Sequence, residues 1–240
     1  MSERSKIMKS SFVFKRKEKK YIINSSQYRT FLIMAKKYIE KDKYEKYTIC
    51  NIYYDTQDYD LIRKSIEKPS YKEKLRLRSY GIPSKSDKVY IELKKKYNGI
   101  VFKRRISATL EESENYLNNN IPIKNSCQIF NEIDYFKNLY HIVPKKYIAY
   151  DRTAFSGLDD PSLRITFDEN IRSRDYDLTL DAGDYGEILT EKGIYIMEIK
   201  ASSVYPLWLC HILSELKIYP SSYSKYGNVY KKELLTKRSS

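Results

Sequence analysis

The chain has 240 residues, enough for one large domain with a substantial core, and its charge is strongly unbalanced. Lysine and arginine number 45 against 31 aspartate and glutamate, a formal net charge of +14 that favours phosphates, nucleotides, nucleic acid or an anionic membrane surface as partners. The three cysteines are widely spaced and form no CxxC pair, which argues against a disulfide framework or a zinc site and favours a reducing compartment.

Several classes of segment and site are excluded. No run of about 18 apolar residues occurs, and the start of the chain lacks the apolar core of a signal peptide, so we expect a cytoplasmic protein. None of the 7 glycines belongs to a GxxxxGK[ST] or GxGxxG loop, which excludes phosphate binding through a P-loop or a Rossmann turn. We expect a single α+β domain over 1–240, with 1–10 loosely structured.

The N-terminal quarter of the chain predicts two strands and two helices. A strand over 11–23 with alternating charges comes first, and Asn24 or Ser25 can cap the helix after it. Apolar residues at helical spacing extend this helix to about Glu40. The next two elements are a strand over 47–55 and a short helix over 56–68 that Pro69 ends.

The strand predicted over 72–80 has the most informative pattern. In Lys74-Leu75-Arg76-Leu77-Arg78, strict alternation puts three cations on one face of the strand and two leucines on the other. Like charges on one face repel each other unless an anion lies across them, and the arginine fork suits phosphate. For this strand alone, a solvent-exposed sheet face remains the alternative.

The same alternation returns in the strands that follow. Strands over 88–97 and 100–107 are joined by Asn98-Gly99, a strong hairpin signal. Further strands are predicted over 146–155, 162–169, 175–181 and 193–201. If these strands close into one antiparallel barrel, the charged positions converge on a lumen that must hold water, ions or a polyanion.

Helices are predicted between and after these strands. Thr109 and Glu112 form a capping box that opens a short helix to about Asn118. The remaining helices are one over 126–140, one that starts at Pro206, and a last one that ends near Leu235. The sequence therefore predicts an α+β protein with about eight antiparallel strands covered by helices.

Eight short motifs occur in the chain: Glu18-Lys19-Lys20-Tyr21, Ile52-Tyr53-Tyr54-Asp55, Lys74-Leu75-Arg76-Leu77-Arg78, Glu92-Leu93-Lys94, Tyr150-Asp151-Arg152-Thr153-Ala154-Phe155, Arg164-Ile165-Thr166-Phe167-Asp168, Met197-Glu198-Ile199-Lys200 and Ser222-Tyr223-Ser224-Lys225-Tyr226. In this order, and from about residue 11 to 231, the chain resembles the VTC domain, the polyphosphate polymerase module of the vacuolar transporter chaperone complex. That family belongs to the triphosphate tunnel metalloenzymes, so the resemblance implies a closed antiparallel β-barrel with a basic tunnel and flanking helices.

The resemblance also implies an activity, a cofactor and site residues. The activity is transfer of the γ-phosphate of ATP to inorganic polyphosphate, with a divalent metal, Mn²⁺ first and Mg²⁺ second. The implied catalytic residues are Arg76, Arg78, Arg152, Arg164 and Lys225. The implied phosphate-binding residues are Lys20, Lys94, Lys103, Tyr150, Lys200 and Ser224, with Arg104 or Arg105 as alternatives to Lys103. The implied metal ligands are Glu198 and, as a second candidate, Glu18.

ATP and inorganic polyphosphate are the expected partners, without specific nucleic acid. The family adds two expectations, a membrane-protein partner and a peripheral position at the inner face of the membrane; no oligomeric state is predicted. Two alternatives stay open. One is a tripolyphosphatase or nucleoside triphosphatase, for which more carboxylates on the first strand would be the signal, and the other is a polyphosphate-binding module without turnover. Nucleic-acid binding, from the net charge alone, is a further alternative.

Overall fold

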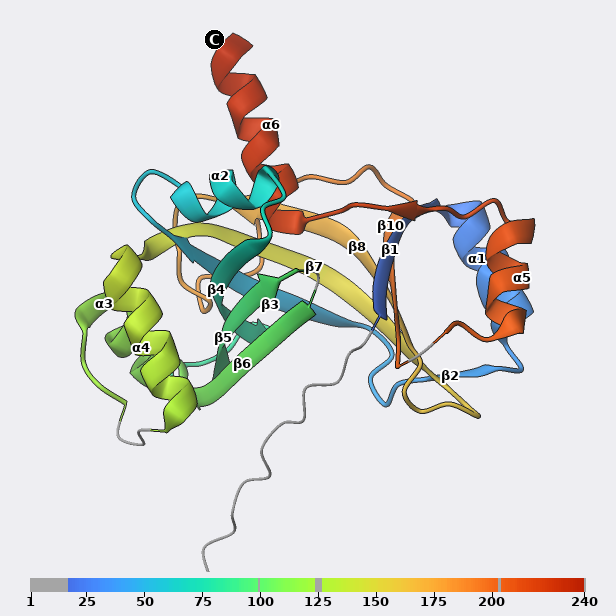
Figure 1. Ribbon diagram of the computed structural model, residues 1–240, viewed down its shortest axis with the longest axis horizontal. Helices are drawn as coiled ribbons and strands as arrows, with labels where there is room; N and C mark the ends of the chain where they lie inside the picture. Colours follow the sequence, from blue (N-terminus) through green and yellow to red (C-terminus); the bar gives the residue numbers. More distant parts are fainter. Residues whose placement is uncertain (1–16, 99, 124–126, 203, 240) are drawn as a thin grey trace, which may run out of the picture.

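The centre of the fold is one antiparallel sheet that bends strongly on itself (Figure 1). The computed structural model describes residues 17–98, 100–123, 127–202 and 204–239. The long strands are β1 (Lys17–Asn24), β3 (Tyr47–Asp55), β4 (Tyr71–Tyr80), β5 (Lys88–Tyr97), β6 (Ile100–Thr109), β7 (Val143–Gly157), β8 (Arg164–Arg174) and β10 (Ile194–Ala201). The short strands are β2 (Ile39–Lys41), β9 (Glu187–Ile188) and β11 (Pro220–Ser221).

The predicted closure of the barrel is wrong. The strand order is β11-β1-β10-β8-β7-β3-β4-β5-β6, and among the described residues no backbone pairing joins β1 to β6. The outer edge of β1 pairs instead with the two residues of β11, opposite Lys20 and Tyr21. Curvature still brings the far strands together, since the Glu18 carboxylate of β1 lies 4.0 Å from the Lys94 ammonium of β5. We call the inner side of this bend the concave face.

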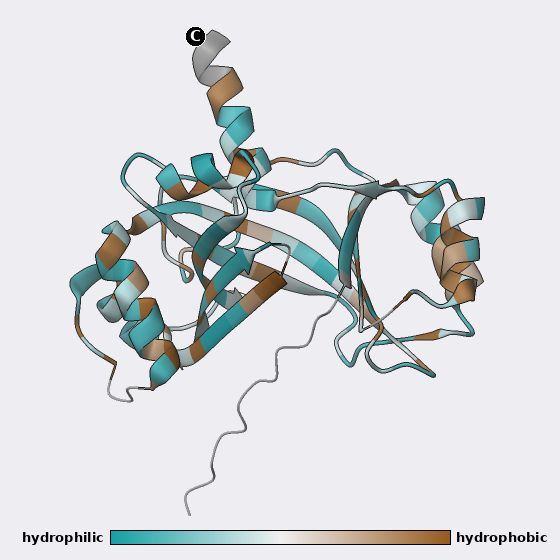
Figure 2. Ribbon diagram, in the orientation of Figure 1, coloured by the Kyte–Doolittle hydropathy of each residue, from teal (hydrophilic) through white to brown (hydrophobic). Residues whose placement is uncertain are grey.

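The alternation predicted for the strands is confirmed. Leu75 and Leu77 are fully buried on the convex side, under α3 (Leu110–Asn119) and α4 (Gln128–Tyr140). At the other end of the molecule, α1 (Ser25–Ala35) and α5 (Leu207–Glu215) cover the convex side of β1 and β10. Both hydrophobic and hydrophilic residues occur along the strands (Figure 2). The strands therefore give many of their apolar residues to a helix layer and most of the site's charges to the opposite face, although Arg104 of β6 points the other way and pairs with Glu132 of α4.

Two further helices pack on the concave face. The helix α2 (Asp60–Ile66) contacts β3 and β4, and α6 (Lys225–Ser239) contacts β7 and then projects away from the sheet (Figure 1). The ring of Tyr226 stacks on that of Tyr53 at 4.9 Å, and its hydroxyl donates to the buried Asp55 carboxylate at 3.0 Å. Val229 joins the same apolar cluster, so this part of the concave face is filled by side chains.

Most predicted boundaries agree with the structure, and the two predicted caps are present. Asn24 caps α1 and Thr109 caps α3, each in a capping box. The first helix ends before the predicted Glu40, because residues 39–41 form β2. Parts of the predicted strand over 11–23 and helix over 126–140, and Gly99 of the predicted turn, lie outside the described residues. Tyr97 and Ile100 do pair across that turn, as a hairpin requires.

The strand predicted over 175–181 is wrong. The Arg174 guanidinium donates to the backbone carbonyls of Asp177, Thr179 and Tyr185, and the loop winds around it. Asp177 takes a left-handed backbone conformation, with a φ of 45°, that interrupts an extended strand. Among the described residues, no helix is both long and apolar enough to cross a bilayer.

Candidate functional site

Charged side chains from most long strands converge on the concave face. Residues directly opposite in an antiparallel pair point to the same side of the sheet. Arg76 lies opposite Glu92, and Glu92 lies opposite Arg105, so three neighbouring strands present charge at one level. The same rule places further site residues on this face: Glu18, Lys20, Lys94, Lys103, Tyr150, Arg152, Arg164, Glu198 and Lys200.

Glu92 of β5 joins four of these cations. Its Oε2 accepts from Nε and Nη2 of Arg76 at 2.8 and 2.6 Å, and its Oε1 accepts from Nε of Arg105 at 2.7 Å and pairs with Lys103 at 2.8 Å. Arg78 lies 3.8 Å away. Burial alone would raise the pKa of Glu92, but the charges of Arg76, Arg78 and Lys103 outweigh burial and hold that pKa far below its ordinary value. Glu92 is therefore a buried anion whose hydrogen bonds hold the guanidinium groups of Arg76 and Arg105 in place.

Asp168 of β8 plays a similar part on the other side of the face. Arg152 binds it through two hydrogen bonds, from Nε to Oδ1 at 2.6 Å and from Nη2 to Oδ2 at 2.8 Å. The Lys225 ammonium, at the start of α6, lies 2.5 Å from Oδ2. Burial raises the pKa of Asp168, yet the two cations outweigh it and lower that pKa to about 2. The carboxylate is thus ionised at any physiological pH.

The metal-ligand candidates lie on the paired strands β1 and β10. Glu198 sits 2.5 Å from Lys200 and 3.8 Å from Lys20, while Glu18 lies 3.9 Å from Lys200 and 4.0 Å from Lys94. Burial would raise the pKa of Glu198, but Lys200 and Lys20 hold it well below its ordinary value. Because Glu198 faces Lys20 and Glu18 faces Lys200 across the ladder, the two carboxylates are diagonal neighbours on one face.

These carboxylates suit one mode of metal binding. No group of three or more His, Cys, Asp or Glu gathers in the described parts of the chain, which gives no support to an all-protein metal cage. Mg²⁺ and similar hard cations commonly bind one or two carboxylates and complete their shell with water and substrate phosphates. Glu198 and Glu18 fit that mode.

The positive charge of the face is incompletely compensated near Lys74. Burial, reinforced by the charges of Lys94, Arg76 and Lys20, lowers the pKa of Lys74 to about 8. Burial likewise lowers the pKa of Lys103 to about 8, although Glu92 partly opposes it. An anion placed against these ammonium groups would relieve their desolvation and repulsion, so this is where the face gains most from binding one.

Three predicted site residues have protein partners that restrict the role expected for them. Arg78 is only 6% exposed, and it donates to the Asn51 amide oxygen at 2.9 Å and to the Tyr150 hydroxyl at 3.1 Å, so its fork is already engaged. Ser224 accepts from the backbone N–H of Gly227 at 3.2 Å and caps α6. Arg164 lies at the rim, 2.6 Å from Asp42.

Four residues that are not among the site residues implied by the resemblance belong to the charge network of the site. They are Tyr53, Lys74, Glu92 and Asp168. The two-residue alternation along the strands puts these residues on the same face as the predicted ones, so the sequence pattern could have identified them. Tyr53 accepts from Nη1 of Arg76 at 3.3 Å. Burial would raise the pKa of Tyr53, but Arg76, Lys74 and Arg78 outweigh it and lower that pKa to about 7.

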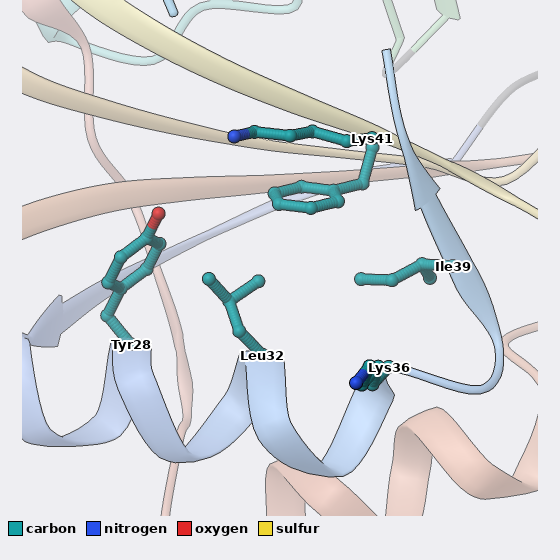
Figure 3. Close-up of a pocket in the computed structure, with 6 residues that line it drawn as sticks. Tyr28, Leu32, Lys36, Ile39 and Lys41 are labelled. Atoms are coloured by element: carbon teal, nitrogen blue, oxygen red, sulfur yellow. The ribbon is translucent and has the colours of Figure 1, made fainter. Parts of the chain in front are cut away.

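One cavity lies apart from this face. It has a volume of about 250 Å³ and lies on the convex side between α1, β2 and β7 (Figure 3). Its lining residues are Tyr28, Leu32, Lys36, Ile39, Lys41 and Phe155. None of the predicted site residues lines it.

Two solved structures share the fold. One is a proposed adenylate cyclase from Bacillus halodurans, with a TM-score of 0.55 and 14% identity over 86% of this chain and 92% of that one. The other is a proposed adenylyl cyclase from Hippeastrum, described as revealing a dominant triphosphatase activity, with a TM-score of 0.50 and 15% identity over 87% of this chain and 92% of that one. At such identities the similarity is one of fold alone.

Sequence comparison gives a more specific result. No curated protein matches the chain at a significant level. The family model for the VTC domain, however, matches residues 15–233. This range contains every strand of the sheet and all of the residues gathered on the concave face. The chain therefore belongs to the VTC domain family.

Proposed function

We propose that this protein transfers the γ-phosphate of ATP to a growing inorganic polyphosphate chain on its concave face. The observation that carries the proposal is the excess of cations around Lys74, where burial and like charges already lower the lysine pKa to about 8. A polyanion supplies the charge that this arrangement lacks. Membership of the VTC domain family supports the same substrate class.

The fixed guanidinium groups suit phosphoryl transfer, which depends on alignment and charge neutralisation. The attacking group is a terminal phosphate oxygen of the chain, which is already ionised and needs no general base. As it bonds to the γ-phosphorus, the bond to the bridging oxygen breaks and ADP leaves with that electron pair. Arg76 is held by Glu92 and Arg152 by Asp168, so donors aimed at the phosphates need little reorganisation.

A divalent cation completes this proposal. Glu198 and Glu18 would hold Mn²⁺, or Mg²⁺, together with phosphate oxygens. Such an ion would supply Lewis-acid neutralisation of the developing charge. Lys200 and Lys20 flank Glu198 and hold its pKa below its ordinary value, so this carboxylate is ionised and ready to bind a cation.

A triphosphatase is the second candidate, because the same cations could hold a triphosphate while water attacks. The fold shared with the Hippeastrum protein is compatible with this chemistry. Water needs a base, however, and within its described residues β1 contributes a single carboxylate, that of Glu18. This favours a phosphate acceptor over water.

Product analysis separates the two candidates. Purified protein is incubated with ATP and Mn²⁺, and ADP, orthophosphate and chain length are followed together. A polymerase releases more ADP than orthophosphate, with the missing phosphate in chains visible on a gel. A triphosphatase releases the two in equal amounts without chains. Arg152→Ala should abolish either activity, whereas Lys231→Ala, an exposed change on α6, should leave it intact.

A further inference from the structure

Four tyrosines form a continuous row beside the cations of the concave face. The ring centroids of Tyr44 and Tyr47 are 6.3 Å apart, those of Tyr47 and Tyr80 are 6.0 Å apart, and those of Tyr80 and Tyr90 are 5.7 Å apart. Tyr80 is two residues after Arg78 and so shares its face of β4, and Tyr90 lies opposite Arg78 in the ladder. We call Tyr44, Tyr47, Tyr80 and Tyr90 the tyrosine row.

The row leaves aromatic surface open to solvent. Tyr44 is 65% exposed and Tyr80 is 50% exposed, in contrast to the buried Tyr53 and Tyr54 of the same strand region. The rings meet edge to face or at a tilt, with interplanar angles of 72°, 57° and 78°, and none of the three pairs is a parallel stack. A contiguous exposed apolar patch beside a charged site commonly marks a ligand surface.

The row is also in contact with the phosphate-binding cations. The Arg105 guanidinium lies 4.5 Å above the Tyr90 ring and is at the same time bound to Glu92. Burial would raise the pKa of Tyr80, but a hydrogen bond from Arg105 and the charge of Arg78 outweigh it and lower that pKa. Arg152 lies opposite Tyr47 in the ladder and brings a further cation to the row. A triphosphate on these cations would place its nucleoside within reach of the exposed rings.

We propose that the tyrosine row is a stacking platform for the nucleobase of the phosphate donor. This inference rests on the proposed function and adds how the base of its nucleoside triphosphate donor is recognised. The base stacks on the exposed faces of Tyr44 and Tyr80, and the triphosphate extends towards Arg105 and Lys103 beside Glu92. Stacking depends on ring area more than on base edges, so ATP and GTP bind alike and UTP binds more weakly.

The chain offers a matched control on the same two strands. Tyr71 and Tyr97 form a similar edge-to-face pair, with centroids 6.4 Å apart at 62°, and they are 44% and 53% exposed. They lie at the other end of the β4–β5 ladder, and by alternation on the convex side with Leu75 and Leu93. A general effect of losing an exposed tyrosine would therefore appear in Tyr97→Ala as well.

The test compares ATP with inorganic tripolyphosphate by titration calorimetry. Tyr80→Ala and Tyr44→Ala should each weaken ATP binding about tenfold relative to tripolyphosphate, which has no base to stack. Tyr80→Phe keeps the ring and should retain the wild-type ratio of the two affinities, as should Tyr97→Ala. Tyr44 is the most exposed member of the row, so its variant keeps the test valid if Tyr80→Ala folds poorly.

The outcomes distinguish this inference from the proposed function. If wild-type protein binds tripolyphosphate and ATP but the ratio of their affinities is unchanged in both alanine variants, the platform is disproved while the phosphate site stands. If the wild type binds neither compound, the proposed function fails, and the platform fails with it. A selective loss of ATP affinity in the row variants, absent from Tyr97→Ala, supports the platform.

Discussion

The Lys225 ammonium lies 2.5 Å from Oδ2 of Asp168 and so ties the first residue of α6 to the middle of β8. Arg152 binds both oxygens of the same carboxylate, which is fully buried. The Lys225 ammonium also lies 4.2 Å from the centroid of the Tyr150 ring. The helix and the charged face are therefore linked through one buried anion, and a change at Lys225 should affect stability as well as phosphate binding.

The first prediction follows from this pair. Lys225→Met should lower the free energy of unfolding by about 3 kcal/mol, the lower end for a buried pair that loses one partner, because Arg152 remains on Asp168. Urea denaturation measures the change. Lys231→Met on the exposed side of α6 is the control and should shift stability by less than about 0.5 kcal/mol. Equal effects of the two changes would contradict the importance of the ion pair.

A second prediction concerns Glu92. Glu92→Gln leaves the cations around it without their buried anion, so the melting temperature should fall. Added polyphosphate should then raise it more than in the wild type, because a bound anion supplies the missing charge and stabilises only the folded state. Differential scanning fluorimetry with and without polyphosphate checks this. The same ligand-induced shift in both proteins would mean that phosphate does not approach these cations.

The third prediction is a pH dependence. The pKa values of Lys74 and Lys103 are about 8 in the folded protein against 10.5 for an ordinary lysine. Between about pH 8 and 10.5, these two lysines are protonated in the unfolded chain but largely deprotonated in the folded protein. The contribution of both groups to stability is therefore lowest below pH 8 and rises up to about pH 10.5.

Polyphosphate binding should show the opposite trend. The anion favours the charged lysines, so its affinity should fall as the pH rises through about 8. The affinity is measured by titration calorimetry in metal-free buffer. The ligand is a long polyphosphate, because its few terminal phosphates then contribute little to the pH dependence. Lys74→Met should flatten the profile, whereas Lys88→Met, at the exposed start of β5, should not. A flat profile in the wild type would exclude these lysines from the binding surface.

The fourth prediction tests the metal candidates. Glu198→Gln should abolish metal-dependent turnover and also lower the melting temperature, because Lys200 and Lys20 both lose a buried partner. Glu18→Gln, at a more exposed position, should reduce turnover less. Metal-free binding of polyphosphate should persist in both variants. Wild-type rates in Glu198→Gln at saturating Mn²⁺ would rule out its role as a ligand.

Alternation in the sequence predicted which side chains share a face. Leu75 and Leu77 are in the core, and Arg76 faces the charged side as expected, because the two-residue period of a strand is a local property. The caps at Asn24 and Thr109 were predictable for the same reason. Local rules therefore gave most element boundaries and most of the residues on the concave face.

Closure and pairing between distant strands were not predictable in this way. Whether β1 meets β6 depends on the accumulated curvature and on β11, a segment almost two hundred residues beyond β1 that takes part of its edge. The convergence of four cations on Glu92 likewise depends on β4 and β6 flanking β5 in register. The sequence identified Glu92 only as one member of a motif.

Among the described residues, no backbone pairing closes the sheet between β1 and the β5–β6 hairpin. This seam has a consequence for a polymer substrate. A closed barrel would admit a long chain only by threading from one end, at a cost in time that grows with its length. In the described part of the chain, the ion pair between Glu18 and Lys94 spans this seam where a backbone ladder would otherwise lie. If the concave face binds polyphosphate as proposed, parting this one pair would let the middle of a chain be laid in sideways, so that loading would not depend on polymer length.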